Sequence, residues 1–496
     1  MFIIFKYFIY FLIFLSLLLF YFLFTPLGHS NIYYFLGKAL SKKNNIHIEV
    51  QSINIINYPN VNIELSIKKR AKLTLKGHLD DTLVDMKYTL RSDCVESKYC
   101  KMNDNVDIHG GIKGHFNKIF ITGKGKALDG NITYKAIKYA EKIEDFTLNI
   151  YDANSTKLIN LLGKKIDIKG KTNANVNFSL IGKKERHGNI TLDLEDKNYK
   201  SIPIKLHVDA NISNDISSFM ATVKSTYLSL DIFNGSYNQV NKQAKAFYLL
   251  DIKELHKLKK LLGQDYKGSF YARGEMTYKD KIKITGLSKS FGGLVAFAFE
   301  DNLLKMKLKK TSLIDIVNLF SISSILKANI DGDINYNFKH KRLDVHSTLN
   351  NAKFLPSTLV NVIKKKSNVN MMNETFNNSK LDATYQHNVV LANLKLINKN
   401  SHVNLTSANI NTKNNTIDAY FDFKMQHQEF SGKVYGSLDS PKVNLDMQKL
   451  VRYQMDKQVD KIIGESGRKL MENLPMGGVA KDVATDMGAS FIKIFF

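Results

Sequence analysis

The chain is poor in several residue types, and each shortage excludes a class of protein. Six prolines and 28 glycines among 496 residues exclude a collagen-like or proline-rich architecture. Two cysteines exclude a disulfide-dense scaffold and a four-thiolate metal site. Only seven of the 71 basic residues are arginine, the residue that phosphate and base recognition usually recruit. We therefore expect no nucleic-acid partner.

Lysine supplies almost all of the net charge of +25. The lysines are scattered in pairs and triplets along the chain, which favours the solvated faces of strands and turns. Attraction to an anionic membrane surface is a second interpretation. A hydrophobic content of 44% is enough for a sizeable core, so general disorder is excluded.

The chain begins with a long apolar run. Residues 2–24 are apolar or aromatic except for Lys6 and Ser16. As a helix this run measures about 34 Å, enough to cross the hydrocarbon core of a membrane. No small-residue cleavage site follows, so residues 1–28 are predicted to be an uncleaved signal anchor, a transmembrane helix. Because Lys6 lies near the start of the run and Lys38 is the next basic residue after it, we expect a cytoplasmic N-terminus and an exported remainder.

Residues 29–446 are dominated by a period of two. Every second residue is apolar in 61–67, 202–212 and 417–425, which gives each strand one apolar and one polar face. Asp129-Gly130, Asn234-Gly235 and Asp331-Gly332 are typical of tight turns between strands. The pattern predicts a mainly β protein, an elongated and curled antiparallel sheet with short connecting helices.

Three segments share an internal repeat. A short amphipathic helix, a break and an alternating strand follow one another in 158–178, in 258–278 and, more weakly, in 316–336. The copies are unevenly spaced, so the repeat indicates an irregular array rather than a strict solenoid.

Further helices are expected near the end of the chain. Apolar residues fall at helical spacing in 447–474 and in 479–494, separated by Pro475 and Gly477-Gly478. Residues 447–496 are therefore predicted to be amphipathic helices that either cap the sheet or dock on a membrane or partner. Another helix is expected within 357–376.

No catalytic motif is present in the sequence. Gly170-Lys171-Thr172 resembles the end of a phosphate-binding loop, but Lys165 stands where that loop needs a glycine, and a strand pattern follows. A dinucleotide fingerprint, a G-x-S-x-G motif and an H-E-x-x-H motif are all missing. We expect a protein that is not an enzyme, with no catalytic residue and no cofactor.

Cys94, Cys100, His109 and His115 form one cluster of possible ligands. They are separated by five, eight and five residues, whereas finger-type zinc sites need closer cysteine pairs, so we expect no metal. A disulfide between Cys94 and Cys100 is the preferred interpretation, because an exported chain meets an oxidising compartment.

A sheet with one apolar face has to cover that face. It can pack on a second sheet or curl around its own apolar side, and a curl that stays open forms a hydrophobic groove suited to acyl chains. For an anchored chain, membrane lipid is the nearest apolar ligand. The candidate lipid-groove residues are Ile63, Leu65, Val176, Phe178, Leu192, Leu194, Leu206, Val208, Leu405, Ala419, Phe421 and Phe423.

Several segments together resemble the AsmA-like family. They are the signal anchor, the proline-containing hairpin segment 53–59, the irregular L-x-x-L-L-G units, and segment 436–446 with the charged amphipathic helix after it. The resemblance implies a β-taco groove in the bacterial periplasm that binds phospholipids and acts in phospholipid transport and outer-membrane homeostasis. It also implies a single-pass inner-membrane protein. The chain is much shorter than the longest bridging members, which favours an additional envelope protein partner.

Two other functions stay open at this point. An assembly or structural factor for outer-membrane proteins would use sheet edges and the C-terminal helices for protein contacts. A polycation that tethers anionic envelope polymers would depend on lysine charge and weaken steeply with salt.

The anchor leads to a prediction about topology. A periplasm-dependent enzymatic reporter fused after Phe496 should be active, and the membrane-bound protein should keep its original N-terminus, because no cleavage site follows the apolar run. Reporter activity in cells and N-terminal sequencing test this. Activity of a cytoplasm-only reporter, or a mature chain that starts near His29, would contradict the prediction.

Overall fold

The structure is a computed structural model that describes residues 37–38, 41–42, 47–96, 101–164, 166–263, 265–319, 324–367, 369–425 and 428–446. The predicted anchor (1–28) and the predicted C-terminal helices (447–496) lie outside these residues. Within them, no helix is both long and apolar enough to cross a membrane. The chain divides into two compact units, residues 1–265 with 269–282 and residues 266–268 with 283–496.

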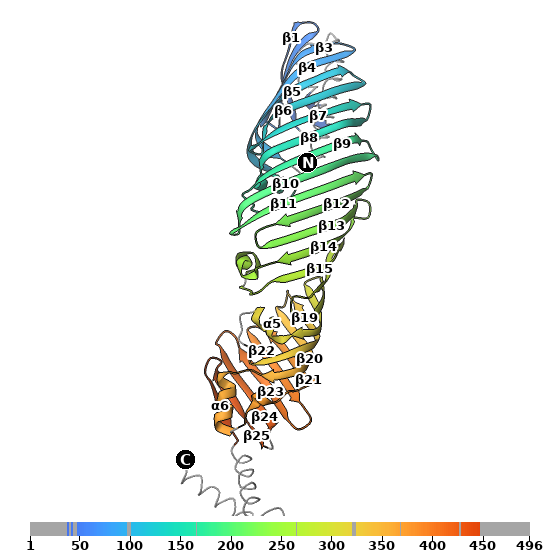
Figure 1. Ribbon diagram of the computed structural model, residues 1–496. Coiled ribbons are helices and arrows are strands. Elements are labelled where there is room, and N and C mark those ends of the chain that lie inside the picture. Colours follow the sequence, from blue (N-terminus) through green and yellow to red (C-terminus); the bar gives the residue numbers. More distant parts are fainter. Residues whose placement is uncertain are drawn as a thin grey trace, which may run out of the picture. The chain divides into compact units, whose positions relative to one another are not determined.

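The described residues of unit 1 form fifteen strands, which pair antiparallel in chain order from β1 to β15. Figure 1 shows them as successive rungs of a curled, open sheet. The strands are β1 (Ile48–Asn57), β2 (Asn60–Ile67), β3 (Ala71–Leu79), β4 (Leu83–Glu96), β5 (Lys101–His115), β6 (Lys118–Ala127), β7 (Gly130–Tyr139), β8 (Lys142–Asn154), β9 (Lys171–Ile181), β10 (Arg186–Tyr199), β11 (Ile202–Ser213), β12 (Ile216–Lys224), β13 (Leu228–Asn238), β14 (Gln243–Ile252) and β15 (Phe270–Lys279).

Unit 2 repeats this arrangement from β16, whose first two residues belong to unit 1. Its strands also pair antiparallel in chain order. They are β16 (Lys281–Ser288), β17 (Leu294–Glu300), β18 (Leu303–Ser312), β19 (Leu326–Asn337), β20 (Arg342–Phe354), β21 (Ser379–Gln386), β22 (Val389–Ile397), β23 (His402–Asn411), β24 (Thr416–Met425), β25 (Gln428–Ser437) and β26 (Pro441–Leu445). The predicted mainly β, curled antiparallel fold is confirmed for the described residues.

The alternating pattern of the sequence corresponds to alternating burial in the strands. In β2, Val61, Ile63 and Leu65 are buried while their neighbours are more exposed. In β24, Ala419, Phe421, Phe423 and Met425 are buried in the same way. We call the face that carries these apolar side chains the inner face, and the opposite one the outer face.

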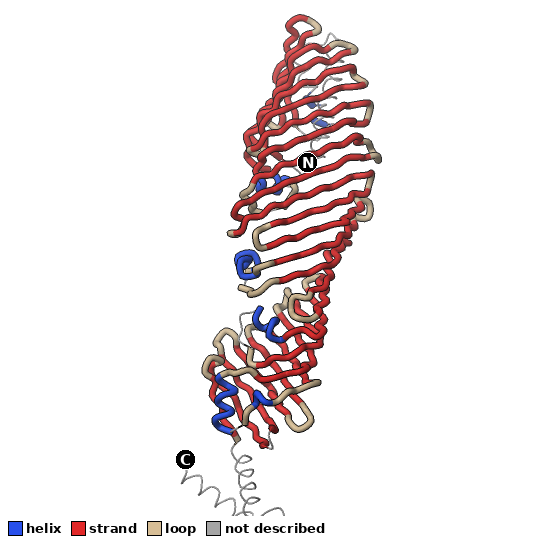
Figure 2. The backbone as a smooth tube through the Cα atoms, viewed as in Figure 1, coloured by secondary structure: helices blue, strands red, loops and turns tan. Residues whose placement is uncertain are grey.

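Short helices interrupt the strands where the repeat predicted them. Figure 2 shows these helices in blue among the red strands. They are α3 (Ser155–Leu161), η1 (Leu255–Leu258) with α4 (Lys259–Leu262), α5 (Leu313–Leu319), and α6 (Thr358–Ser367) followed by η2 (Met371–Asn373). Gly163 and Gly263 follow the first two helices with left-handed φ values of 80° and 78°, which is why the repeat ends each helix in glycine. The helix expected within 357–376 is confirmed in its first part.

Two of the predicted turns are wrong. Asp129-Gly130 does connect β6 to β7, but Asn234-Gly235 lies inside β13 and Asp331-Gly332 lies inside β19. These two glycines leave room on the inner face instead. A Cβ atom at Gly235 would meet the ring of Phe219 on the neighbouring strand, and one at Gly332 would meet Ser347. Crowding on a concave face, rather than chain reversal, requires glycine here.

Four β-bulges have the same local structure. In each, the extra residue has a left-handed φ between 50° and 55°. Its backbone N–H donates to the side chain of an Asn or Asp that lies in an adjacent strand or, for Asn377, just before the first residue of that strand. The pairs are Asp152 to Asn173 (2.8 Å), Lys310 to Asp331 (3.0 Å), Asn351 to Asn377 (2.8 Å) and Ser407 to Asn393 (2.9 Å). A bulge leaves one backbone N–H without a partner in the strand ladder. In these four bulges the Asn or Asp side chain accepts the hydrogen bond of that N–H.

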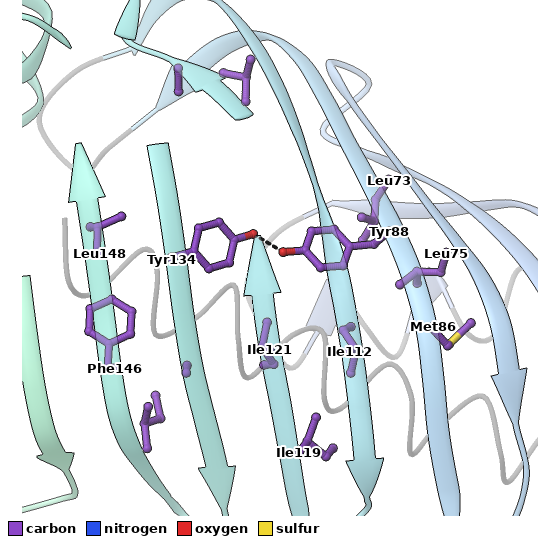
Figure 3. Close-up of a cluster of buried hydrophobic side chains, with 14 of the residues drawn as sticks. Leu73, Leu75, Met86, Tyr88, Ile112, Ile119, Ile121, Tyr134, Phe146 and Leu148 are labelled. Atoms are coloured by element: carbon purple, nitrogen blue, oxygen red, sulfur yellow. Dashed lines mark hydrogen bonds between the residues drawn. The ribbon is translucent and has the colours of Figure 1, made fainter. Parts of the chain in front are cut away.

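A row of two tyrosines and two glycines crosses the inner face of unit 1. Tyr88 of β4 is followed across the sheet by Gly110, Gly123 and Tyr134 of β7. The two rings lean over the glycines until their hydroxyl groups form a hydrogen bond (Figure 3). The Tyr88 hydroxyl also lies 2.9 Å from the carbonyl oxygen of Thr122. Burial raises the pKa of both tyrosines, that of Tyr134 to about 12. The neighbouring Tyr134 raises the pKa of Tyr88 further. Both phenols therefore stay neutral.

Helix α3 is attached to the sheet by a buried ion pair. Lys157 Nζ lies 2.7 Å from Asp104 of β5, whose side chain is fully buried, and 2.6 Å from Asp129 in the β6–β7 turn. Asp104 also accepts the backbone N–H of Leu128 at 2.5 Å. Burial alone would lower the pKa of Lys157, but its hydrogen bonds to both carboxylates outweigh that effect and raise it. The lysine therefore stays charged and joins helix α3 to β5 and to the β6–β7 turn.

Loss of the buried carboxylate should destabilise unit 1 strongly. Asp104→Ala leaves Lys157 and the Leu128 N–H without their buried partner, which should cost about 3–5 kcal/mol. Asp129→Asn removes the exposed negative charge beside the same lysine while tolerating the left-handed φ of 60° at this position, and it should cost less than about 1 kcal/mol. Hydrogen exchange of the amides of α3 and β5 in the full chain measures both. Equal effects of the two variants would contradict this assignment.

Candidate functional site

The twelve candidate groove residues all lie on the inner face, but the structure divides them into two groups. Eight are buried by other side chains of the chain itself. These are Ile63, Leu65, Val176, Phe178, Leu194, Ala419, Phe421 and Phe423. The other four, Leu192, Leu206, Val208 and Leu405, keep part of their surface exposed.

Most of the eight buried residues belong to two packed clusters, one in each unit. In unit 1 the cluster is formed by β1 to β9 with α3, and it contains Ile63 and Phe178. In unit 2 it runs from β17 to β26 with α6 and contains Phe421 and Phe423. The rings of Phe423 and Phe430 lie 3.6 Å apart, and that of Phe421 lies 6.0 Å from Phe423. At these places the inner face is filled by the chain's own side chains.

The inner face of β10 to β15 in unit 1 differs. Two rows of side chains cross it in register, and neither contains a charged residue. One row is Leu192, Val208, Ala221, Ile232, Tyr248 and Gly274, and the other is Leu194, Leu206, Val223, Leu230, Leu250 and Ala272. Nine of these twelve residues are only partly buried, the exceptions being Leu194, Tyr248 and Ala272. We call these two rows the apolar face.

On β10, β11, β14 and β15 the outer face carries ion pairs. His207 of β11 contacts Asp193 and Asp209, each at 2.7 Å, and these hydrogen bonds raise the pKa of His207. Lys205 pairs with Glu195 at 3.6 Å, and Lys245 with Glu275 at 3.2 Å. Since facing charges are matched in pairs, this side of the sheet is suited to water, and the apolar face lies on the other side of the same backbone.

One described hollow is polar rather than apolar. It has a volume of about 560 Å³ and lies over β1 to β5, and it is lined by Arg70, Arg91, Lys69 and Lys72 among other residues. Carboxylates lie beside three of these cations: Lys72–Glu64 at 2.8 Å, Arg91–Asp107 at 3.6 Å and Arg70–Asp93 at 3.8 Å. The hollow therefore has little unmatched charge with which to attract an anion.

The cysteine and histidine cluster is only partly described. Cys94 of β4 forms no disulfide with a described residue, and Cys100 lies outside the described residues, so the disulfide stays a prediction. His109 and His115 lie in β5, and His115 Nδ1 is 3.1 Å from the carbonyl oxygen of Thr82. The described part of the chain contains no group of three or more His, Cys, Asp or Glu side chains that could hold a metal ion.

Comparison with known proteins adds no family assignment. No known protein family and no curated protein matches this chain. The resemblance to the AsmA-like family therefore depends on the sequence segments described above, and the candidate site depends on the geometry of the apolar face.

Because the inner face is filled by side chains at some positions and partly exposed at others, introduced charge should destabilise the protein to different degrees. Phe421→Glu places a carboxylate among buried rings, at a site only 6% exposed, and should destabilise unit 2 by several kcal/mol. Val208→Glu lies on the apolar face, where the carboxylate can still reach water, and should cost less than about 2 kcal/mol. Urea unfolding of the full chain, followed by hydrogen exchange in β24 and β11, measures both. A Val208→Glu chain as unstable as Phe421→Glu would show that the apolar face is filled too.

Proposed function

We propose that this protein binds phospholipid acyl chains on the apolar face and assists phospholipid transport between the membranes of the bacterial envelope. The observation that carries the proposal is the apolar face itself, two uncharged rows that cross six strands and remain partly exposed. The proposed role is binding and transfer rather than catalysis.

The dimensions and energetics of this face suit an acyl chain. Six strands about 4.8 Å apart make each row about 24 Å long, compared with about 15 Å for half of a bilayer's hydrocarbon core. Apolar surface left in water is unfavourable, and covering it contributes about 25 cal/mol per Å². A long, flexible apolar chain can lie along such a row without requiring directional contacts.

The proposed location follows from the sequence. An uncleaved anchor at residues 1–28 would keep the chain in the inner membrane, with the remainder in the periplasm, and membrane lipid would be the nearest apolar ligand. The AsmA-like resemblance supports the same location and the role in outer-membrane homeostasis. An envelope protein partner and the predicted C-terminal helices (447–496) would act in the transfer of lipid toward the outer membrane.

A second candidate function is an assembly factor for outer-membrane proteins that acts by protein contacts. Three exposed apolar side chains on the outer face of unit 1 favour it: Met220 at 54%, Phe233 at 43% and Phe247 at 37% exposure. The rings of Phe233 and Phe247 stack with centroids 6.1 Å apart, and Lys245 Nζ lies 5.4 Å from the centre of the Phe247 ring. A patch of this kind is suited to a flat protein surface.

Photo-crosslinking distinguishes the two functions. A photoreactive residue at Leu192, Leu206 or Val208 of the full chain in cells should capture phospholipid, because these side chains lie on the apolar face. The matched outer-face positions Asp193, Lys205 and Asp209 should capture little lipid, because alternate residues point to opposite sides of the sheet. Mass spectrometry of the adducts is the measurement.

Two further results are informative. A probe at Phe421 serves as a buried control and should form only adducts within the protein, since Phe421 is only 6% exposed and its ring packs against that of Phe423. Equal lipid capture from both faces would contradict the proposal. Protein adducts at Phe233 or Phe247, with no lipid at Leu206 or Val208, would favour the assembly function instead.

A further inference from the structure

One edge of the apolar face is bordered by the link between β14 and β15. This link contains η1 and α4, with Leu255 and Leu258 buried, and Figure 2 shows its helix at the edge of the sheet. The link reaches back along that edge, because Lys260 Nζ lies 2.6 Å from the hydroxyl oxygen of Ser201 in the β10–β11 turn. The link and the β10–β11 turn therefore lie at the same edge of the sheet.

Four exposed lysines gather along this edge, and we call them the lysine rim: Lys200, Lys253, Lys257 and Lys260. The backbone N–H of Lys253 donates to the carbonyl oxygen of Tyr227 at 3.0 Å, and Lys257 Nζ lies 5.9 Å from the centre of the same tyrosine's ring. These contacts place both lysines beside the β12–β13 turn.

The other two lysines lie at the neighbouring turn. Lys260 reaches Ser201, and Lys200 Nζ is 6.0 Å from the ring centre of Tyr199. Tyrosines thus stand under two of the four ammonium groups, an arrangement that combines an apolar ring with a cation at the border of an apolar surface.

The lysine rim carries unmatched charge. None of its four ammonium groups forms an ion pair with a carboxylate of the described residues. The nearby acids have other partners: Asp265 pairs with Lys259 at 3.3 Å, Glu254 with His256 at 3.6 Å, and Asp196 accepts the Asn198 N–H at 2.8 Å.

At the opposite ends of the strands two lysines form ion pairs. Lys142 pairs with Glu185 at 2.9 Å and Lys183 with Glu141 at 3.3 Å. Arg186 donates to the side-chain oxygen of Gln239 at 3.1 Å. Lys184, Lys242 and Lys279 at the same ends form no ion pair with a described carboxylate either, but they lie at three separate turns. The lysine rim differs because its four lysines are gathered at two neighbouring turns by the β14–β15 link.

We propose that the lysine rim binds the phosphate group of an anionic phospholipid whose acyl chains lie on the apolar face. This inference rests on the proposed function and adds to it a ligand class and an orientation. The rim lies close to the second row: Leu250 precedes Lys253 by three residues, Leu230 follows Tyr227 by three, and Leu206 follows Ser201 by five. At about 3.3 Å per residue, the rim and the row are separated by about 10–17 Å along the strands.

An anionic phospholipid fits this region because the lysine rim is cationic and the neighbouring apolar face is uncharged. Acyl chains gain by leaving water, while a phosphate gains by meeting ammonium groups that have no carboxylate beside them. A lipid that satisfies both has its headgroup at the edge and its chains across the strands. A diacylglycerol with the same chains would satisfy only the first.

The test uses the full chain in phosphatidylcholine vesicles that contain equal amounts of phosphatidylglycerol and diacylglycerol with matched acyl chains. A photoreactive residue at Leu206 reports which lipid is captured. The wild type should favour phosphatidylglycerol about tenfold, and replacement of all four rim lysines by glutamine should abolish the preference while diacylglycerol capture continues. Replacement of the four by arginine should retain it.

The matched control removes the same number of charges from the opposite ends of the strands. Replacement of Lys183, Lys184, Lys242 and Lys279 by glutamine should leave the preference unchanged. A preference that survives the rim substitutions, or that disappears equally in the control, overturns the rim assignment while leaving lipid binding intact. Loss of the preference on addition of glycerol phosphate overturns it too, in favour of a soluble phosphate. Absence of any lipid adduct in the wild type overturns the proposed function itself.

Discussion

The structure depends on one geometric constraint, the strict alternation of side chains along antiparallel strands. Most apolar residues of a strand then point to one side, and strands paired in register join these residues into continuous rows. A sheet built in this way has a surface that water disfavours along its whole length. Curling brings that surface to the concave side, where space is limited and where Gly110, Gly123 and Gly235 lie beneath aromatic side chains of neighbouring strands.

The apolar side of the sheet is covered in some parts of the described chain and left partly exposed in another. Where β1 to β9 curl, side chains and helix α3 fill the concave side, and the buried Lys157–Asp104 ion pair holds the helix in place. In unit 2, α6 and the rings around Phe423 fill it similarly. Across β10 to β15 the residues are just as apolar, but among the described residues the two buried clusters do not extend over them, and of the two rows only Leu192 is partly buried against one of these clusters. The difference between core and candidate site is therefore one of coverage, not of composition.

This difference explains how much could be predicted from the sequence. The strands, their one apolar face and the short helices were predictable, because periodicity and the helix-ending Gly163 and Gly263 are local signals. Phe421 and Val208 have the same alternating neighbours, so no local signal separates a filled position from an open one. Asn234-Gly235 was mistaken for a turn because the need for its missing side chain arises from Phe219 on another strand. The rim around Lys260 likewise exists only once the β14–β15 link lies beside Ser201.

The pairing order of the strands has a consequence for how such a molecule can form and change. Within each unit the described strands pair with their neighbours in the sequence, and most chain reversals between them are short, the exceptions being the links that contain helices. Contacts of this local kind carry a small loop-closure cost, so a unit can assemble progressively, hairpin by hairpin, from the first strands to emerge. The same arrangement lets an ancestral sheet be lengthened by duplication of a hairpin, since the added strands extend both rows without altering any existing register.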